Sequence, residues 1–210
     1  QILVDDIIDV FEEEASEDIL KMAGTSEDEL VYGNKILKIS RARLPWLITN
    51  LFGGIITGYL LWLFKVTLKD VLALITFIPV ITAMGGNVGI QSSSIMVRGI
   101  AIRKVNIENL MSILFKELKV GAIMGITCGL VAGVVASFWH HKPLLGLVVG
   151  IAMFFAITVA ATIGTIAPAF FKKVNIDPAL ASGPFVTTAN DITGILIYMV
   201  IATLLLKFLI

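Results

Sequence analysis

This chain of 210 residues contains no catalytic motif that we can identify. It has no Walker loop, dinucleotide-binding fingerprint, nucleophile elbow or HExxH zinc motif, so the sequence predicts that the protein is not an enzyme. A single cysteine, Cys128, excludes disulfides within the chain and cysteine-based metal sites, and we expect it to serve in packing. His140 and His141 have no third candidate ligand near them in the sequence, so we do not predict a metal site there.

Charged residues are also scarce. They make up 15% of the chain, whereas 57% of the residues are hydrophobic, far more than in an ordinary soluble domain. A helix needs about 20 apolar residues to cross a bilayer. Five runs reach that length: 45–64, 71–97, 118–139, 143–171 and 184–209. The sequence therefore predicts an all-α integral membrane protein, with five transmembrane helices in a pore domain over 41–210.

Acidic residues are concentrated before the first of these runs. Residues 1–29 contain eleven acids and one lysine, whereas 30–210 contain fifteen basic residues and five acids. So many acids on one segment form either a solvated helix face or a sensor of divalent cations, which take oxygen ligands. The two parts of the chain are expected to do different jobs.

Residues 1–40 are predicted to form amphipathic cytosolic helices. Apolar residues of 4–23 recur at helical spacing with the acids mostly opposite, and Gly24 is expected to end that helix. A capping-box pattern at 26–29 predicts a second helix that leads to the membrane. The chain begins with Gln1, without Met or a secretory signal, so we expect it to be part of a longer protein.

The distribution of Lys and Arg predicts the orientation in the membrane. Twelve of these residues fall on one side of the predicted spans and four on the other. Because Lys and Arg favour the cytoplasmic side, we expect a multi-pass protein of the cell membrane with a cytoplasmic N-terminus and an external C-terminus. Lys173 should then lie inside and Lys142 outside.

Glycines at a spacing of four predict close helix packing, because small residues let helix backbones approach each other. Four of them lie in the third run: Gly121, Gly125, Gly129 and Gly133. The pattern recurs in the first and fourth runs, at Gly54 and Gly58 and at Gly146 and Gly150. This spacing predicts a compact bundle and no chemistry.

The stretch "MGGNVGIQSSSIMVRG", residues 84–99, interrupts the second run with polar residues that include Asn87 and Gln91. Irregular or polar backbone at that depth is tolerated only inside protein or beside a water-filled cavity. Pro79, just before it, is a residue that can bend the helix. Interruptions by Gly and Pro are typical of transport pathways.

A second interruption is Asp191, in "PFVTTANDITGILIYMV" at 184–200. No Lys, Arg or His lies between Val174 and Leu206 to neutralise it. A charge at the bilayer centre costs about 2.5–3.5 kcal/mol on insertion scales, so such a residue marks a candidate functional site. Asp191 is either a protonated group that forms hydrogen bonds between helices or a carboxylate that faces a passing cation.

Three stretches in this order carry a family resemblance: "DDIIDVFEEEASED" at 5–18, "GGNVGIQSSSIMVRGIA" at 85–101 and "DPALASGPFVTTANDITGILIY" at 177–198. They resemble the linker helix and transmembrane domain of the MgtE magnesium transporters, over essentially the whole chain. The resemblance implies a homodimeric Mg²⁺ channel in the plasma membrane, gated by cytosolic Mg²⁺, with its pore at the dimer axis. It also implies cytosolic N-terminal and CBS domains that this sequence does not contain.

The resemblance further implies particular site residues. Asp191 would hold hydrated Mg²⁺ together with the backbone carbonyls of Thr187 and Gly183, the last of which is an Asn in another member of the family. The second and fifth spans would line the pore, which places three polar residues there: Asn87, Gln91 and Asn190. The acidic helix would act as a plug that binds regulatory Mg²⁺ with Asp177 at the mouth of the fifth span; its ligands would be Asp6, Asp9, Glu14, Glu17 and Asp18.

Two other functions remain open from the residues. A secondary transporter that couples Mg²⁺ to Na⁺ or H⁺ could use the same positions, with Asp191 titrating during its cycle. A membrane scaffold could instead use the acidic helix to recruit a partner. The lipid bilayer and a second copy of the chain are the expected partners, and no nucleic acid is. Permeation by Mn²⁺, Co²⁺ or Ca²⁺ is left open by the sequence.

Overall fold

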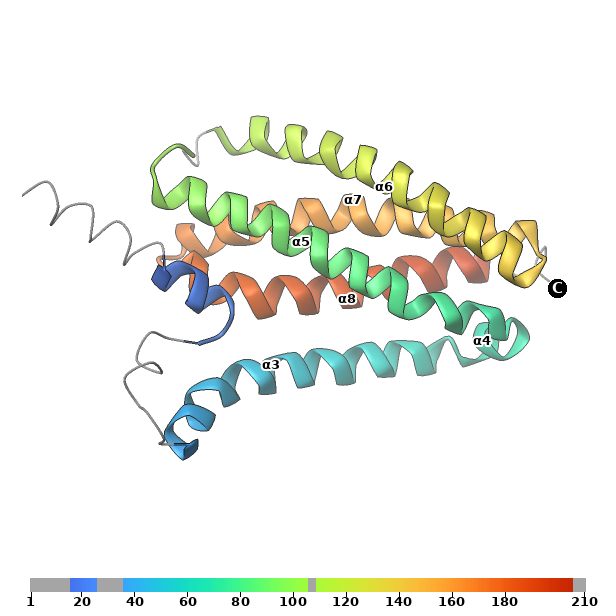
Figure 1. The fold of residues 1–210 in the computed structure, drawn as a ribbon, viewed down its shortest axis with the longest axis horizontal. Coiled ribbons are helices and arrows are strands. Elements are labelled where there is room, and N and C mark those ends of the chain that lie inside the picture. The colour runs from blue at the N-terminus through green and yellow to red at the C-terminus, as the bar shows by residue number, and fades with distance from the viewer. Residues whose placement is uncertain (1–15, 26–35, 106–108, 206–210) are drawn as a thin grey trace, which may run out of the picture.

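The computed structural model describes residues 16–25, 36–105 and 109–205. All regular structure in these ranges is helical (Figure 1). A short helix at 16–22 precedes seven further elements: α3 (Ile36–Leu63), α4 (Lys65–Asp70), the 3-10 helix η1 (Leu72–Phe77), α5 (Ile78–Ala101), α6 (Leu110–His140), α7 (Pro143–Lys173) and α8 (Pro178–Leu204). The predicted capping box at 26–29 lies outside the described residues.

Five helical segments of the described chain are long and apolar enough to cross a membrane, which confirms the predicted fold class. They are Ile36–Leu63, Leu72–Ala101, Leu110–His140, Pro143–Lys173 and Gly183–Leu204. The first and third begin eight or nine residues earlier than the apolar runs 45–64 and 118–139. Both extensions carry basic residues, which can reach the headgroups from a helix that continues beyond the hydrocarbon.

The second span differs from its prediction in two ways. Pro79 does not bend a continuous helix, because it lies in the first turn of α5, where proline is well tolerated. The preceding turns form η1, and Tyr198 of α8 donates a hydrogen bond of 2.9 Å from its hydroxyl to the Leu74 carbonyl. The polar stretch 84–99 is also not irregular: it is regular α-helix throughout.

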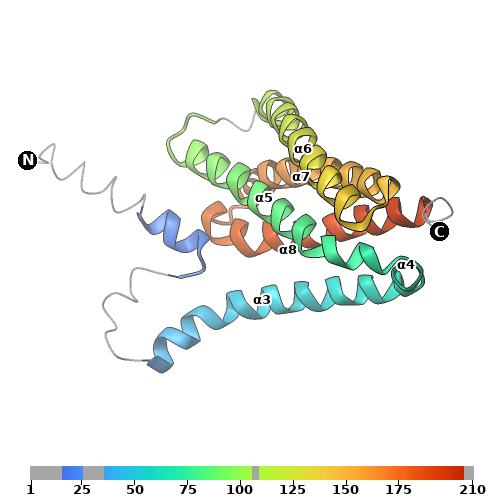
Figure 2. The ribbon, with the colours of Figure 1, turned by 45° about the vertical axis from the view of Figure 1, so that its right-hand side comes forward.

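Helix α7 lies at the centre of the bundle and packs against α5, α6 and α8 (Figures 1 and 2). In its most apolar window 56% of the residues are buried, against 6% for α3, which lies at the edge and packs mainly on α8. Helix α7 therefore supplies more of the buried core cluster than any other element, including Leu145, Val149, Met153 and Ile157.

The glycines of α6 confirm the predicted close packing. A Cβ atom at Gly125 would lie 2.8 Å from the Phe154 carbonyl oxygen of α7, and one at Gly129 would lie 2.6 Å from that of Gly150. In α3, by contrast, a Cβ atom at Gly54 or Gly58 would meet no atom of the described residues within 4 Å. The same glycine spacing thus accompanies close helix packing in α6 and an open surface in α3.

Candidate ion-binding site

Helix α8 carries the predicted ion-binding face. Gly183, Thr187 and Asp191 follow each other at intervals of four residues, which places them along one side of the helix. The Thr187 hydroxyl donates to the carbonyl oxygens of Gly183, at 3.1 Å, and Pro184, at 3.0 Å. Asp191 is half-buried near the middle of the helix, and no basic side chain of the described chain forms an ion pair with it.

One end of this face opens into a cavity of about 500 Å³. Helices α3, α5 and α8 and the segment 22–25 together line it, and Gly183 and Thr187 are among the lining residues. The Met22 carbonyl lies so close to Gly183 that a Cβ atom there would collide with it. A side chain at position 183 would therefore push the segment away from α8, so glycine permits this contact.

The polar residues of α5 divide between two sides of that helix. Asn87 and Gln91, which the sequence assigns to a pore, are exposed on the single chain, although α5 is otherwise a membrane-spanning helix. Gly85, Gly89 and Ser92 are buried against the rest of the bundle. Exposed amides at membrane depth need water or another protein surface beside them.

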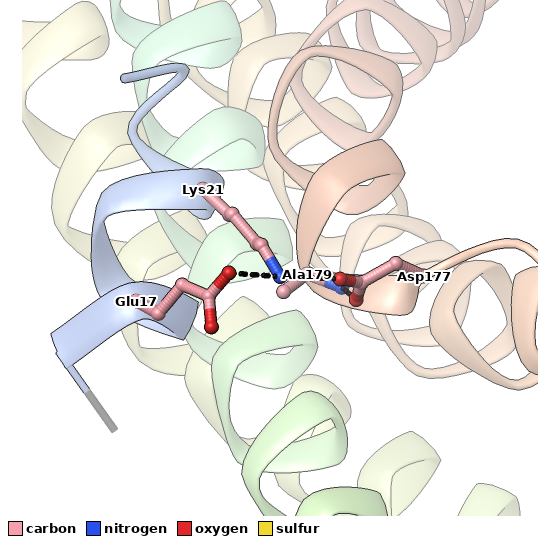
Figure 3. Close-up of polar contacts among 4 residues, drawn as sticks. All are labelled: Glu17, Lys21, Asp177 and Ala179. Carbon is pink, nitrogen blue, oxygen red and sulfur yellow. Dashed lines mark hydrogen bonds and ion pairs between the residues drawn. The ribbon is translucent and has the colours of Figure 1, made fainter. Parts of the chain in front are cut away.

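Acidic residues gather at the start of α8 (Figure 3). The Lys21 ammonium lies 2.8 Å from Asp177 Oδ2 and 2.9 Å from Glu17 Oε1. The other oxygen of Asp177 accepts a hydrogen bond of 2.9 Å from the Ala179 amide, which caps α8. One carboxylate therefore begins the helix that carries Asp191 and also contacts the segment 16–25.

Hydrogen bonds, burial and nearby charges shift the pKa values of two residues in this cluster. Hydrogen bonds to Asp177 first and to Glu17 second raise the pKa of Lys21, so its ammonium stays charged. Burial, followed by the nearby Asp177 charge, raises the pKa of Asp18, although Lys21 opposes that rise. Among the described residues no group of three or more His, Cys, Asp or Glu side chains could hold a metal ion. Three further predicted ligands, Asp6, Asp9 and Glu14, lie outside the described ranges.

A comparison with protein-family models decides the affiliation of the chain. Residues 78–201, which run from α5 to α8 and include the face with Asp191, match the MgtE model, described as a divalent cation transporter. The chain belongs to the MgtE family.

Similar curated proteins extend the match beyond the family model. The magnesium transporter MgtE of Bacillus subtilis is 39% identical over 96% of this chain, and that of Enterococcus faecalis is 39% identical over 99%. The magnesium transporter MgtE of Thermus thermophilus is 36% identical over 98%. The chain spans 45–46% of the length of these relatives. All three are named as transporters and none as an enzyme.

Asn190 differs from the other pore-lining predictions for this MgtE chain. Only 1% of its surface is exposed, and its side-chain amide donates a hydrogen bond of 3.3 Å to the Gly85 carbonyl of α5. It therefore lies between α5 and α8 inside the single chain, and does not share the exposure of Asn87 and Gln91. Its sequence neighbour Asp191 is turned about 100° further round the helix.

Two polar contacts, one at the start of α8 and one between α5 and α6, were not predicted from the sequence. Lys21, the only basic residue in 1–29, is the partner of Asp177; its position four residues after Glu17 is the one available signal. Ser92 of α5 donates to Glu117 of α6 at 2.9 Å. These two residues are 25 positions apart, so no local pattern could have paired them.

Proposed function

We propose that this chain forms the ion-conducting part of a magnesium transporter, and that Asp191 binds hydrated Mg²⁺ as it passes. The observation that carries the proposal is a half-buried carboxylate in the middle of α8 with no basic partner in the described chain. Such a group is retained in a membrane-spanning helix when it faces water or ions. The names of the family and its curated members support Mg²⁺ as the cargo.

We place the path between two copies of the chain. Asn87 and Gln91 are exposed on α5, and lipid would leave their amides without hydrogen bonds. A second copy related by a twofold axis would enclose them in a wet pore, and would bring two Asp191 carboxylates to one divalent ion. Mg²⁺ keeps several of its waters when bound, so a few carboxylates and carbonyls suffice and no protein cage is needed.

Charge balance should then decide selectivity. Two unit charges about 4 Å apart attract by roughly 4 kcal/mol at an effective dielectric constant of 20, and a divalent ion feels twice the attraction of Na⁺ or K⁺. The carbonyls of Gly183 and Thr187 would add ligands that do not distinguish ion charge so strongly. Asp191 therefore contributes most of the preference for divalent ions in this proposal.

The decisive experiment measures Mg²⁺ flux in liposomes, with Na⁺ or K⁺ as competitor, for Asp191→Asn and Asp191→Ala. Both should assemble as the unsubstituted chain does and lose at least about tenfold in Mg²⁺ flux, because neither restores the charge. Thr127→Ala is the control, because the Thr127 hydroxyl donates to the Ile123 carbonyl within α6 and is exposed. Full selectivity in Asp191→Asn would contradict the electrostatic mechanism, and flux that requires a Na⁺ or proton gradient would indicate an exchanger.

We further propose that the segment 16–25 closes the cytoplasmic end of the path. The Met22 backbone covers Gly183, and Lys21 holds the segment to Asp177. Mg²⁺ bound by the acids of this segment would stabilise that closed arrangement, provided it binds the closed state more tightly than the open one. Removal of residues 1–25 should then raise flux at high cytosolic Mg²⁺, and unchanged inhibition would contradict this role.

The proposed orientation places the Asp177 end of α8 in the cytoplasm. Lys173 and Lys142 lie at the two ends of α7, a helix of 31 residues. Single cysteines at these positions, in a chain without Cys128, should react with impermeant reagents from opposite sides. Reaction of both from the same side would contradict the topology.

A further inference from the structure

Asn190 forms a contact between the two helices that we assign to the pore. Its Nδ2 donates to the Gly85 carbonyl of α5 at 3.3 Å, and its side chain is almost completely buried. Gly85 is 105 positions away in the sequence. The bond therefore joins α5 and α8 at the level of Asp191.

The surroundings of Asn190 leave its amide little room to move. A Cβ atom at Gly89 would collide with Asn190 Nδ2 and would lie 2.9 Å from Val186 Cγ1. On the neighbouring helix α7, a Cβ atom at Gly164 would collide with the Gly89 carbonyl. Two glycines thus bring α5 close to α7 and α8, and the Asn190 amide occupies the space that a side chain at position 89 would fill.

The chemistry of the amide argues against simple space filling. Asn190 Oδ1 is buried and has no hydrogen-bond partner in the described part of the chain. A buried polar atom without a partner is destabilising, and a leucine, which has the same branching, would avoid that cost. What an amide provides here and a leucine cannot is the hydrogen bond to Gly85.

We propose that Asn190 is a positioning residue for ion selectivity, an inference that rests on the function proposed above. Its hydrogen bond holds the register of α5 relative to α8. Asn87, two residues from both Gly85 and Gly89, faces outward on α5, whereas Asp191, one residue from Asn190, lies on the ion-binding face of α8. Fixing Gly85 against Asn190 therefore fixes the spacing between the amides of α5 and the carboxylate of α8.

Two substitutions test this role from opposite sides of the contact. Asn190→Leu keeps the branched shape of the side chain, with a larger volume, and removes the donor, while Gly89→Ala keeps Asn190 and displaces its amide. Each should raise the Mg²⁺ concentration for half-maximal flux, and lower the Mg²⁺-to-Na⁺ flux ratio, by roughly two- to tenfold, as expected for one hydrogen bond. The matched control is Gly194→Ala, one turn further along α8, where a Cβ atom would meet only Ile81 at 3.7 Å and Ala156 at 4.0 Å.

The readouts separate positioning from stability. Size-exclusion chromatography and thermal unfolding in detergent report folding, and fluxes are compared per folded protein in liposomes. A variant could be less stable and still keep the Mg²⁺ dependence and the flux ratio of the unsubstituted chain. That result would show a merely structural role and overturn the proposal. If Asn190→Leu does not fold, the fluxes of Gly89→Ala test the proposal, since alanine has a high helix propensity. A double variant Gly89→Ala, Asn190→Ala restores the packing without the bond, and recovery of the flux ratio in it would also overturn the proposal.

The same experiment distinguishes this inference from the function on which it rests. No Mg²⁺ flux by the unsubstituted chain would contradict the proposed function. Mg²⁺ flux that both single variants leave unchanged would contradict only the positioning role of Asn190.

Discussion

The contact of α6 with α7 and that of α3 with α8 use glycine to very different extents. Between α6 and α7, glycine backbone faces helix backbone along several turns, from Gly121 on one helix to Gly146 on the other. Between α3 and α8, one close approach stands out, where Gly53 faces the Thr188 side chain. Thr188 also donates a long hydrogen bond of 3.5 Å to Asn50.

The α6–α7 contact is therefore part of a rigid framework, whereas α3 presents an exposed surface. The glycine seam, formed by Gly121, Gly125, Gly129 and Gly133 of α6, puts the backbones of α6 and α7 in direct contact. A closely packed contact of this kind cannot take up added volume by small adjustments. Helix α3 leaves most of its apolar residues exposed on the single chain, so lipid or another protein surface must cover them. The segment 16–25 lies on this less tightly packed side, where Gly24 contacts Trp46 of α3. The gate that we propose is thus placed on the part of the molecule that can move at lower cost.

The largest effect is expected where glycine faces backbone. Gly125→Leu should lower the free energy of unfolding by about 3 kcal/mol or more, because neither the Phe154 carbonyl nor its Cα can move aside. Yield of folded protein and thermal unfolding in detergent measure it, and any surviving protein should keep its ion preference. Gly54→Leu is the matched control, since that position is open. Equal losses in both would show that α3 is packed as tightly as α6 in the assembled protein.

A smaller effect is expected where glycine faces a side chain. Gly53→Ala should lower the free energy of unfolding by about 1 kcal/mol, because the Thr188 side chain that the new methyl group meets can change its rotamer. Thr188→Ala in the same chain should recover at least half of that loss in a double-mutant cycle of thermal stability. Independent, additive losses would mean that the two residues do not touch in the folded protein.

The smallest effect is expected at the ion pair on the surface. Lys21→Gln should loosen the segment 16–25 and speed cleavage after Glu17 by an acidic-specific protease up to about fivefold, since exposed ion pairs contribute only about 0–1 kcal/mol. Mass spectrometry of the early fragments measures this rate. High salt should produce the same change in the unsubstituted chain. Lys65→Gln, at the start of α4 and remote from the segment, is the control. Equal cleavage rates in the unsubstituted chain, Lys21→Gln and Lys65→Gln would argue against the pair.

Much of the fold was predictable because the bilayer imposes simple rules. Apolar runs of sufficient length must become helices in a chain of this composition, and five of them did. The glycine seam of α6 was predictable for the same reason, since small residues at a spacing of four favour close contact. The identical spacing at Gly54 and Gly58 shows the limit of that rule: spacing indicates a possible contact, and only the position of neighbouring helices decides whether it forms.

The second span shows what periodicity cannot predict. Proline and several glycines between 79 and 99 suggested a bent or irregular helix, but η1 takes up the change of geometry before α5 begins. The Tyr198 hydroxyl, from α8, binds the Leu74 carbonyl of η1. A contact over 124 positions leaves no local trace in the sequence.

Asn190 and Asp191 separate what the sequence by itself determined from what only the tertiary structure decided. The sequence determined that Asp191 has no basic neighbour from Val174 to Leu206, and this marks it as a candidate functional site. It could not distinguish the tasks of two adjacent polar residues. The tertiary structure decided that, because one residue turns a helix by about 100°, which is enough to aim Asn190 at the Gly85 carbonyl and leave Asp191 half-exposed on the neighbouring face.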